Sequence, residues 1–228
     1  MHLYLLIGQS NMAGRGTVED VDRTPDPRIL VLTQALAWQP ASEPLHFDKP
    51  GITGVGPGLA FARAMAQQTE VRIGLIPCAV GGTSIRAWEP GAADQATSTH
   101  PYDDMLVRAR AALAAGVLTG IIWHQGEADR ADASYGEKLT ALVQRVRSDL
   151  AAPAVPFVAG ELAAFRPEVE ETTRGFNTRL NALVATIPHF AVITAAGTTD
   201  KGDQLHFDAA SARLLGGRYA EAMRRLQS

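Results

Sequence analysis

Short apolar runs alternate along this chain with longer stretches in which apolar residues recur at helical spacing. The apolar runs lie at residues 3–8, 29–33, 71–77, 117–123, 156–162 and 190–195. Most of them are apolar nearly throughout, which is typical of parallel strands that are covered on both faces. The alternation of strand and helix predicts an α/β fold, a three-layer α/β/α sandwich with a mainly parallel sheet.

Helical spacing is clearest in the stretches that follow the third, fourth, fifth and sixth runs. Apolar residues recur there within 102–113, 135–150, 176–184 and 212–226. Pro57 and Gly58 predict the start of a further helix, because proline is favoured in the first helical turn. Asp208 is predicted to be the N-cap of the last helix.

The length of 228 residues suits one α/β domain, and we expect residues 1–228 to form a single domain. Hydrophobic residues make up 46% of the chain and charged residues 20%, so a large core can form. The segment from Gly14 to Gly56 is irregular and rich in proline, glycine and aspartate. We predict an extra hairpin or a long surface loop there.

The composition argues against several classes of protein. The net charge is -3 and no basic patch is evident, which argues against a nucleic-acid partner. The single cysteine, Cys78, cannot form an intrachain disulfide. No apolar run is long enough to span a bilayer, and the N-terminus lacks the features of a signal peptide. These features predict a cytoplasmic protein without a membrane partner, unless a signal peptide has been removed.

Polar and glycine residues gather where four of the predicted strands end. They are Ser10 after the first run, Gly81 and Gly82 after the third, Gln125 and Glu127 after the fourth, and Asp203 and His206 after the sixth. In open α/β sheets, ligands bind beyond the carboxyl ends of the strands. We therefore expect these residues to meet at one edge of the sheet and to form a site.

Ser10, His206 and Asp203 have the chemistry of a nucleophilic triad. A serine hydroxyl is a poor nucleophile unless a base removes its proton, and histidine suits that task near neutral pH. A carboxylate is needed to hold the imidazole in the correct tautomer. Asp203 lies three residues before His206, so one turn of loop is able to bring its oxygens to the far ring nitrogen.

Acyl transfer also needs fixed donors for the oxyanion of the tetrahedral intermediate. The backbone N–H groups near Ser10 and Gly82, together with the side-chain amide of Gln125, are candidates. Glycine at position 82 matters because only a residue without Cβ lets the backbone approach a ligand closely.

Each of these residues also has a structural explanation. Ser10 suits a turn or a helix cap, and Asp203 suits a loop residue that bonds its own backbone. His206 alone is compatible with a structural histidine, and Gln125 with a buried amide. For Glu127, support of the active site and a buried hydrogen-bond hub are equally compatible with the sequence.

Arg86 and Trp88 follow the glycine pair, and aromatic faces suit pyranose rings. Both are candidates for lining a sugar site, and the alternative is that they pin the loop. The histidines and acids are not spaced like known metal-ligand sets, and we expect no metal and no organic cofactor. We expect His46 to be solvated, along with three other histidines that show no ligand spacing: His2, His100 and His189.

The motifs GQSNM, GGTSI followed by Trp88, WHQGE and DQLHFD resemble the four sequence blocks of SGNH-type hydrolases. More closely, they resemble the sialate O-acetylesterase and acetyl xylan esterase group, carbohydrate esterase family six. The similarity runs from about residue 3 to residue 223. One block alone is weak, whereas four blocks in order at predicted strand ends are specific.

The resemblance implies a flavodoxin-like fold and hydrolysis of O-acetyl esters on sugars. It implies Ser10 as nucleophile, His206 as base and Asp203 as the partner of the base. It also implies Gly82 and Gln125 as oxyanion donors, although many SGNH hydrolases have asparagine where this chain has Gln125. Glu127 belongs to the HQGE signature of the group. We favour Asp203 as the main partner of His206 and keep Glu127 as a supporting residue.

Three functional hypotheses follow. The first is a carbohydrate O-acetylesterase that acts on a small-molecule or oligosaccharide acetyl ester. The second is an esterase for other short-chain acyl groups, and the third is a non-catalytic carbohydrate-binding relative. The intact set of Ser10, Asp203 and His206 favours an enzyme over the binding relative. The sugar and the oligomeric state stay open, because fold and triad do not encode the leaving group.

Overall fold

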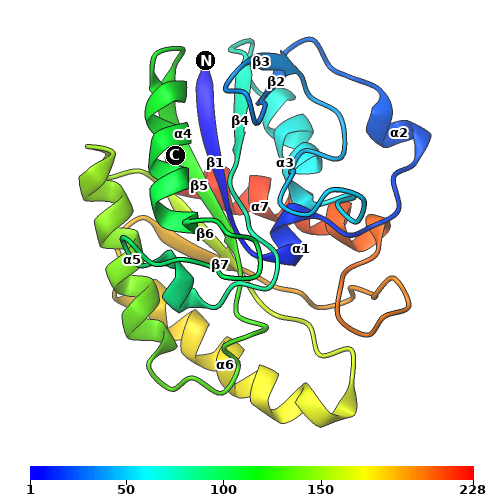
Figure 1. Ribbon diagram of the computed structural model, residues 1–228, viewed down its shortest axis with the longest axis vertical. Helices are drawn as coiled ribbons and strands as arrows, with labels where there is room; N and C mark the ends of the chain where they lie inside the picture. Colours follow the sequence, from blue (N-terminus) through cyan, green and yellow to red (C-terminus); the bar gives the residue numbers. More distant parts are fainter.

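The computed structural model describes all 228 residues and has one seven-stranded sheet at its centre (Figure 1). The strand order across the sheet is β3-β2-β4-β1-β5-β6-β7. The strands are β1 (His2–Gly8), β2 (Ile29–Leu32), β3 (Trp38–Pro40), β4 (Ile73–Pro77), β5 (Val117–His124), β6 (Phe157–Gly160) and β7 (Phe190–Ile193). Every neighbouring pair is parallel except β2 and β3.

Five of the strands, β4-β1-β5-β6-β7, have the order 2-1-3-4-5 of a flavodoxin-like sheet when they are numbered among themselves. β1 lies at the centre, where Leu5 pairs with Ile76 of β4 on one side and Ile121 of β5 on the other. The predicted three-layer α/β fold with a mainly parallel sheet is confirmed.

The helices follow the predicted stripes closely. They are α1 (Ser10–Ala13), α2 (Asp20–Arg23), α3 (Pro57–Ala66), α4 (Pro101–Leu113), α5 (Tyr135–Asp149), α6 (Glu170–Ala182) and α7 (Ala209–Gln227), with short 3₁₀ turns η1 (Ile85–Trp88), η2 (Pro167–Val169) and η3 (Leu183–Ala185). α6 begins before residue 176, where its predicted apolar stripe starts. Its first residues are polar and mostly exposed, so an apolar pattern does not detect them. Asp208 caps α7 as predicted, since its side chain accepts from the Ser211 N–H at 2.7 Å.

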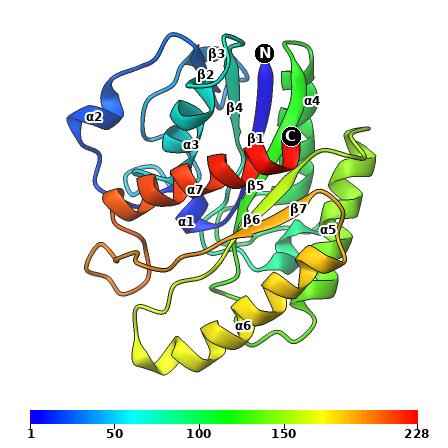
Figure 2. The same cartoon turned by 180° about the vertical axis from the view of Figure 1, so that it is seen from behind.

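The sheet separates two apolar cores, and successive side chains of β1 point alternately into one core and the other. Leu3, Leu5 and Ile7 pack on the face that is covered by α4, α5 and α6. Tyr4 and Leu6 pack on the opposite face, which is covered by α3 and α7. Figures 1 and 2 show these two helical layers from opposite sides. The strands are apolar nearly throughout because both of their faces are buried.

The segment from Gly14 to Gly56 contains the predicted extra hairpin, formed by β2 and β3 at the edge of the sheet beyond β4. The rest of the segment consists of α2 and loops. The two ends of this segment lie side by side, because the Gly54 N–H donates to the Gly14 carbonyl and Gly16 pairs with Val55. None of the helices combines the length and the hydrophobicity that a membrane-spanning helix needs.

Candidate active site

Ser10 follows the carboxyl end of β1, and the close approach of β1 to β5 sets the position of Ser10. Gly8 has a φ of +131°, and a Cβ at this residue would lie 2.2 Å from the carbonyl oxygen of His124. Only glycine fits here. The Gln9 N–H then donates to the same His124 carbonyl at 2.9 Å, and the chain turns directly into α1.

Ser10 is the first residue of α1 and its side chain is almost buried. The backbone N–H of a first helical residue has no acceptor within the helix. That of Ser10 has no acceptor elsewhere in the protein either, so it remains free to bind a ligand.

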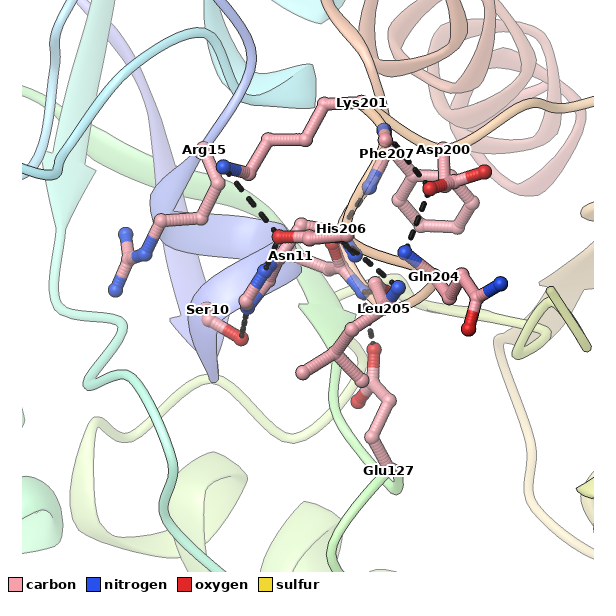
Figure 3. A network of polar contacts seen from close by, with 12 residues as sticks. Ser10, Asn11, Arg15, Glu127, Asp200, Lys201, Gln204, Leu205, His206 and Phe207 are labelled. Atoms are coloured by element: carbon pink, nitrogen blue, oxygen red, sulfur yellow. Dashed lines mark hydrogen bonds and ion pairs between the residues drawn. The ribbon is translucent and has the colours of Figure 1, made fainter. Parts of the chain in front are cut away.

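His206 and Asp203 lie in the loop between β7 and α7. Figure 3 shows that this loop brings His206 to Ser10. The Nε2 atom of His206 lies 3.0 Å from the Oγ atom of Ser10. The other ring nitrogen, Nδ1, lies 2.7 Å from the Oδ2 atom of Asp203. The three side chains therefore form a continuous chain of hydrogen bonds from carboxylate to hydroxyl.

The carboxylate of Asp203 is held in its charged form. Partial burial by itself raises the pKa of Asp203, but hydrogen bonds from the His206 N–H, the His206 ring and the Leu205 N–H outweigh burial and lower it. The net result is a pKa well below the usual range for aspartate. Lys201 adds a positive charge, with its Nζ atom 3.4 Å from the Oδ2 atom of Asp203.

No hydrogen bond joins Glu127 to His206, and the Glu127 carboxylate instead accepts one from the side-chain amide of Asn11. Asn11 also donates to the Leu205 carbonyl at 3.3 Å and accepts from the Phe207 N–H at 3.1 Å. Asn11 thus bonds the backbone on both sides of His206, as Figure 3 shows. The second oxygen of Glu127, Oε2, is buried without a partner.

Gly82 presents a second unpaired backbone N–H at this edge of the sheet. The residue is exposed, has a φ of +89° and finds no hydrogen-bond acceptor for its N–H in the protein. The space where a side chain would stand is open, since the only heavy atom within 4 Å of an added Cβ is the Nζ atom of Lys49, at 3.7 Å.

Gln125 departs from the expected arrangement. Its side chain is fully buried, and its Nε2 atom faces three protein acceptors: the Gln9 side-chain oxygen at 3.1 Å, the Thr83 carbonyl at 3.0 Å and the Asp129 carboxylate. An amide has two hydrogens, so neither is left for an oxyanion. These contacts differ from the arrangement expected for an oxyanion donor, and they join Gln125 to the segments of Gln9, Thr83 and Asp129.

Trp88 also differs from its expected role at a sugar site. It is 1% exposed, packs edge-on against Trp123 and donates to the Thr83 hydroxyl at 3.3 Å. It therefore pins the glycine loop, which was the alternative explanation. Arg86 is exposed and forms no ion pair.

His46 was expected to be solvated, but it is only 5% exposed. Burial lowers the pKa of His46 to about 4.

Three polar residues near the site were missed by reasoning from the sequence: Asn11, Arg15 and Asp48. Asn11 and Arg15 follow Ser10 closely, so their nearness to this candidate nucleophile was a usable signal. Asp48 lies in the irregular segment, where no periodic pattern marks a residue that reaches the site. Its position depends on long-range packing that spacing does not reveal.

A hollow of about 720 Å³ opens at the ends of β6 and β7, beside the loop that carries His206. Half-buried Phe165 lines it, and the ring of Phe165 packs edge-on against Phe207 with centroids 5.5 Å apart. The other lining residues are mainly polar: Glu161, Leu162, Ala163, Ala164, Glu170, Thr173, Arg174, Asn177, Thr178, Asn181, Thr194, Ala195, Ala196, Gly197 and Thr198.

The sheet order and the loops at its carboxyl edge define the fold of the SGNH hydrolases, a class of α/β ester hydrolases. Residues 1–225 match the sequence model of the family described as carbohydrate esterase, sialic acid-specific acetylesterase. The chain belongs to this family and is a carboxylic ester hydrolase.

Individual relatives agree with this assignment. The chain is 33% identical to the probable carbohydrate esterase At4g34215 of Arabidopsis thaliana over 247 residues, 96% of this chain and 89% of the relative. The solved structure of that Arabidopsis protein superposes with a TM-score of 0.85 at 31% identity and covers 98% of both chains. The fold is also shared with NanS, with a TM-score of 0.75 at 19% identity, 99% of this chain and 97% of NanS.

A third structure is that of XAC1771, a carbohydrate acetylesterase from Xanthomonas citri. The TM-score is 0.73 at 22% identity, and the match covers 99% of this chain and 56% of the other. At that identity the likeness concerns the fold.

Proposed function

We propose that this enzyme removes acetyl groups from carbohydrates, with Ser10 as nucleophile, His206 as general base and Asp203 as the partner of the base. The observation that carries the proposal is the unbroken hydrogen-bond chain from Asp203 through His206 to Ser10, with contacts of 2.7 and 3.0 Å. Such contacts lie within the range required for proton transfer between a nucleophile and its base.

The mechanism follows from the positions of these atoms. Ser10 Oγ attacks the acetyl carbonyl while His206 Nε2 takes its proton, and the charged imidazole is stabilised by Asp203. His206 then protonates the departing sugar oxygen, which leaves an acetyl group on Ser10. A water molecule that is deprotonated by the same imidazole attacks this ester, the imidazole returns the proton to Ser10 Oγ, and acetate is released.

The oxyanion needs donors that are free before the substrate arrives. The backbone N–H groups of Ser10 and Gly82 meet this condition, because neither has an acceptor in the protein. We assign both to the oxyanion hole and leave Gln125 out, since its amide hydrogens are already directed at protein acceptors.

Glu127 supports the site through Asn11 rather than through His206. Its carboxylate fixes the Asn11 amide, and that amide in turn holds the backbone at Leu205 and Phe207. Asp203 therefore orients the imidazole ring, whereas Glu127 acts on the position of the loop that carries the ring. We call Glu127 and Asn11 positioning residues for this reason.

The glycan part of the substrate has a preferred direction. The sugar oxygen leaves as His206 protonates it, so the sugar must lie on the side of the site where His206 stands. The hollow lined by Phe165 lies beside the His206 loop and combines an aromatic ring with many polar groups. That mixture is typical of a ligand pocket, and we place the sugar units next to the acetylated one there. Arg86 remains a second candidate for a glycan contact.

The test is acetate release from a panel of acetylated sialosides and xylo-oligosaccharides, measured beside p-nitrophenyl acetate, butyrate and octanoate. We expect release from at least one acetylated sugar and a steep fall in rate from acetate to octanoate. Fast turnover of octanoate without release from any sugar would identify another kind of esterase. Absence of turnover on every ester would identify a binding protein.

A further inference from the structure

A buried ion pair links the loop that carries Gly82 to the segment directly after α1, the helix that begins at Ser10. The Nη2 atom of Arg15 lies 2.8 Å from the Oδ2 atom of Asp48, and the two side chains are 4% and 1% exposed. The same Oδ2 atom accepts the Gly81 N–H at 2.8 Å. One carboxylate oxygen thus joins two segments that are remote in sequence.

We propose that Asp48 is a positioning residue that sets the oxyanion hole, because it fixes the Gly81 N–H and so presents the neighbouring Gly82 N–H to the substrate. This inference rests on the proposed function, in which Gly82 is an oxyanion donor. It gives the irregular segment from Gly14 to Gly56 a part in the chemistry.

The geometry at Gly81 leaves little freedom. A Cβ at this residue would lie 2.3 Å from the Nη2 atom of Arg15 and 2.7 Å from the Oδ2 atom of Asp48. The backbone of Gly81 is therefore pressed against the ion pair, with no room for a side chain. Gly82, one residue further on, has its N–H unpaired and a φ of +89°, a backbone conformation that favours glycine.

Arg15 connects this arrangement to the nucleophile. It lies two residues beyond α1, and its Nη1 atom donates to the Gly14 carbonyl at 2.7 Å. That carbonyl also accepts the Gly54 N–H at 3.0 Å, which joins the beginning of the segment to its end. Ser10 and Gly82, the two proposed oxyanion donors, are thereby held by one set of contacts.

An ion pair this deeply buried is weak evidence for stability, because the cost of removing both charges from water offsets much of their attraction. A geometric role is therefore the more informative explanation. Oxyanion donors act when they are already in place before charge develops, so a small displacement of the Gly82 N–H is enough to lower the rate.

The experiment compares Asp48→Ala and Asp48→Asn with a matched control, Asp22→Asn. Asp22 is also a buried carboxylate paired with an arginine, Arg213, but it lies in α2 and contacts no residue of the site. The readouts are kcat and KM on p-nitrophenyl acetate and the inhibition constant of methylboronic acid. This acid forms a tetrahedral adduct on the serine and so reports on the oxyanion hole.

We expect Asp48→Ala to lower kcat by about 100-fold, the size of effect seen when one oxyanion donor is lost, with a much smaller change in KM. Methylboronic acid should bind more weakly by a similar factor. Asp48→Asn keeps an oxygen that is able to accept the Gly81 N–H, so we expect it to rescue part of both losses. If Asp48→Ala does not fold, the loss of kcat and of boronate affinity in Asp48→Asn relative to Asp22→Asn decides the matter.

The proposal is overturned if the Asp48 variants that fold match Asp22→Asn in kcat and in boronate affinity. The proposal is also overturned if the Asp48 variants lose thermal stability while kcat and boronate affinity stay unchanged. Ser10→Ala separates this result from the proposed function. Turnover by Ser10→Ala would refute the mechanism itself, whereas an inactive Ser10→Ala beside normal Asp48 variants would refute only the role of Asp48.

Discussion

Asn11, the residue after the proposed nucleophile, accepts a hydrogen bond from the backbone N–H of Phe207, the residue after the proposed base, at 3.1 Å. The nucleophile and the base are therefore joined twice, once through their reacting atoms and once through their neighbours. The second connection does not depend on the protonation of His206, so it holds the loop in place throughout the reaction.

Replacement of Ser10 by alanine should abolish turnover of p-nitrophenyl acetate and leave the fold intact. The hydroxyl supplies the attacking atom, while its removal takes only one oxygen from an almost buried position. The fall in kcat should reach several orders of magnitude, as for other serine hydrolases. Stopped-flow burst measurements and a thermal melt check the two halves of this prediction, and retained activity would rule out Ser10 as nucleophile.

Asp203→Asn should lower kcat by about 10⁴-fold, because an amide stabilises the wrong tautomer of His206 and cannot balance the charged imidazole. Asp203 is the only carboxylate that hydrogen-bonds the ring, with 2.7 Å between Oδ2 and Nδ1. Steady-state kinetics across pH 5 to 9 provide the measurement. A loss of less than about tenfold would assign the charge-stabilising role to another group.

Glu127→Gln should have a smaller effect than Asp203→Asn, because Glu127 acts on the loop through Asn11. We expect kcat to fall about tenfold, because the hydrogen bond from Asn11 keeps an acceptor oxygen but loses its charged partner and weakens. Asn11→Asp is the companion variant, since it removes the donor to Glu127 and keeps an acceptor for Phe207. A loss equal to that of Asp203→Asn would mean that Glu127 takes part in the chemistry directly.

Phe165→Ala should raise KM for acetylated oligosaccharides and leave KM for p-nitrophenyl acetate unchanged. Phe165 lines the hollow beside the His206 loop, where we place the sugar units next to the acetylated one, and p-nitrophenyl acetate has no such units. Arg86→Ala provides the comparison, because Arg86 is exposed and is the second candidate for a glycan contact. Equal effects of Phe165→Ala on both kinds of ester would place the sugar elsewhere.

Glu43 gives the stability of this protein an unusual dependence on pH. Complete burial raises the pKa of Glu43 to about 8, although hydrogen bonds from the Leu45 and Gly56 N–H groups oppose the shift. The folded state therefore keeps a proton that the unfolded state loses above its ordinary pKa, near 4.3. Since the folded state binds more protons, the contribution of Glu43 to stability falls as pH rises from about 4.3 to about 8.

Glu43→Gln removes this proton uptake, so its melting temperature should rise relative to the parent protein as pH increases. Melts at pH 4.5, 6 and 8 provide the test, and the difference should be smallest at pH 4.5 and largest at pH 8. A constant difference over this range would show that Glu43 does not titrate between these limits.

Much of the fold followed from the sequence because apolar runs and helical stripes report burial on two faces directly. The meeting of Ser10 with His206 followed as well, since the ends of parallel strands share one edge of the sheet. The partners of individual side chains did not follow. Gln125 was expected to face the substrate, but it lies among three acceptors that belong to three separate segments of the chain.

Trp88 and Asp48 show, in opposite ways, that nearness in sequence does not predict which residues are in contact. Trp88 lies near the glycine loop in sequence, yet its ring points into the core against Trp123. Asp48 lies far from that loop in sequence, yet its carboxylate bonds Gly81. Direction and long-range pairing are set by tertiary packing, which spacing along the chain does not encode.

The separation of Ser10 and His206 by 196 positions also bears on how the enzyme forms. The ribosome makes the proposed nucleophile long before the proposed base, and the two meet only after the sheet between them has folded. A nascent chain should therefore stay inert towards esters until the loop of His206 has been made. A product that stops before residue 200 would carry the serine with nothing to activate it.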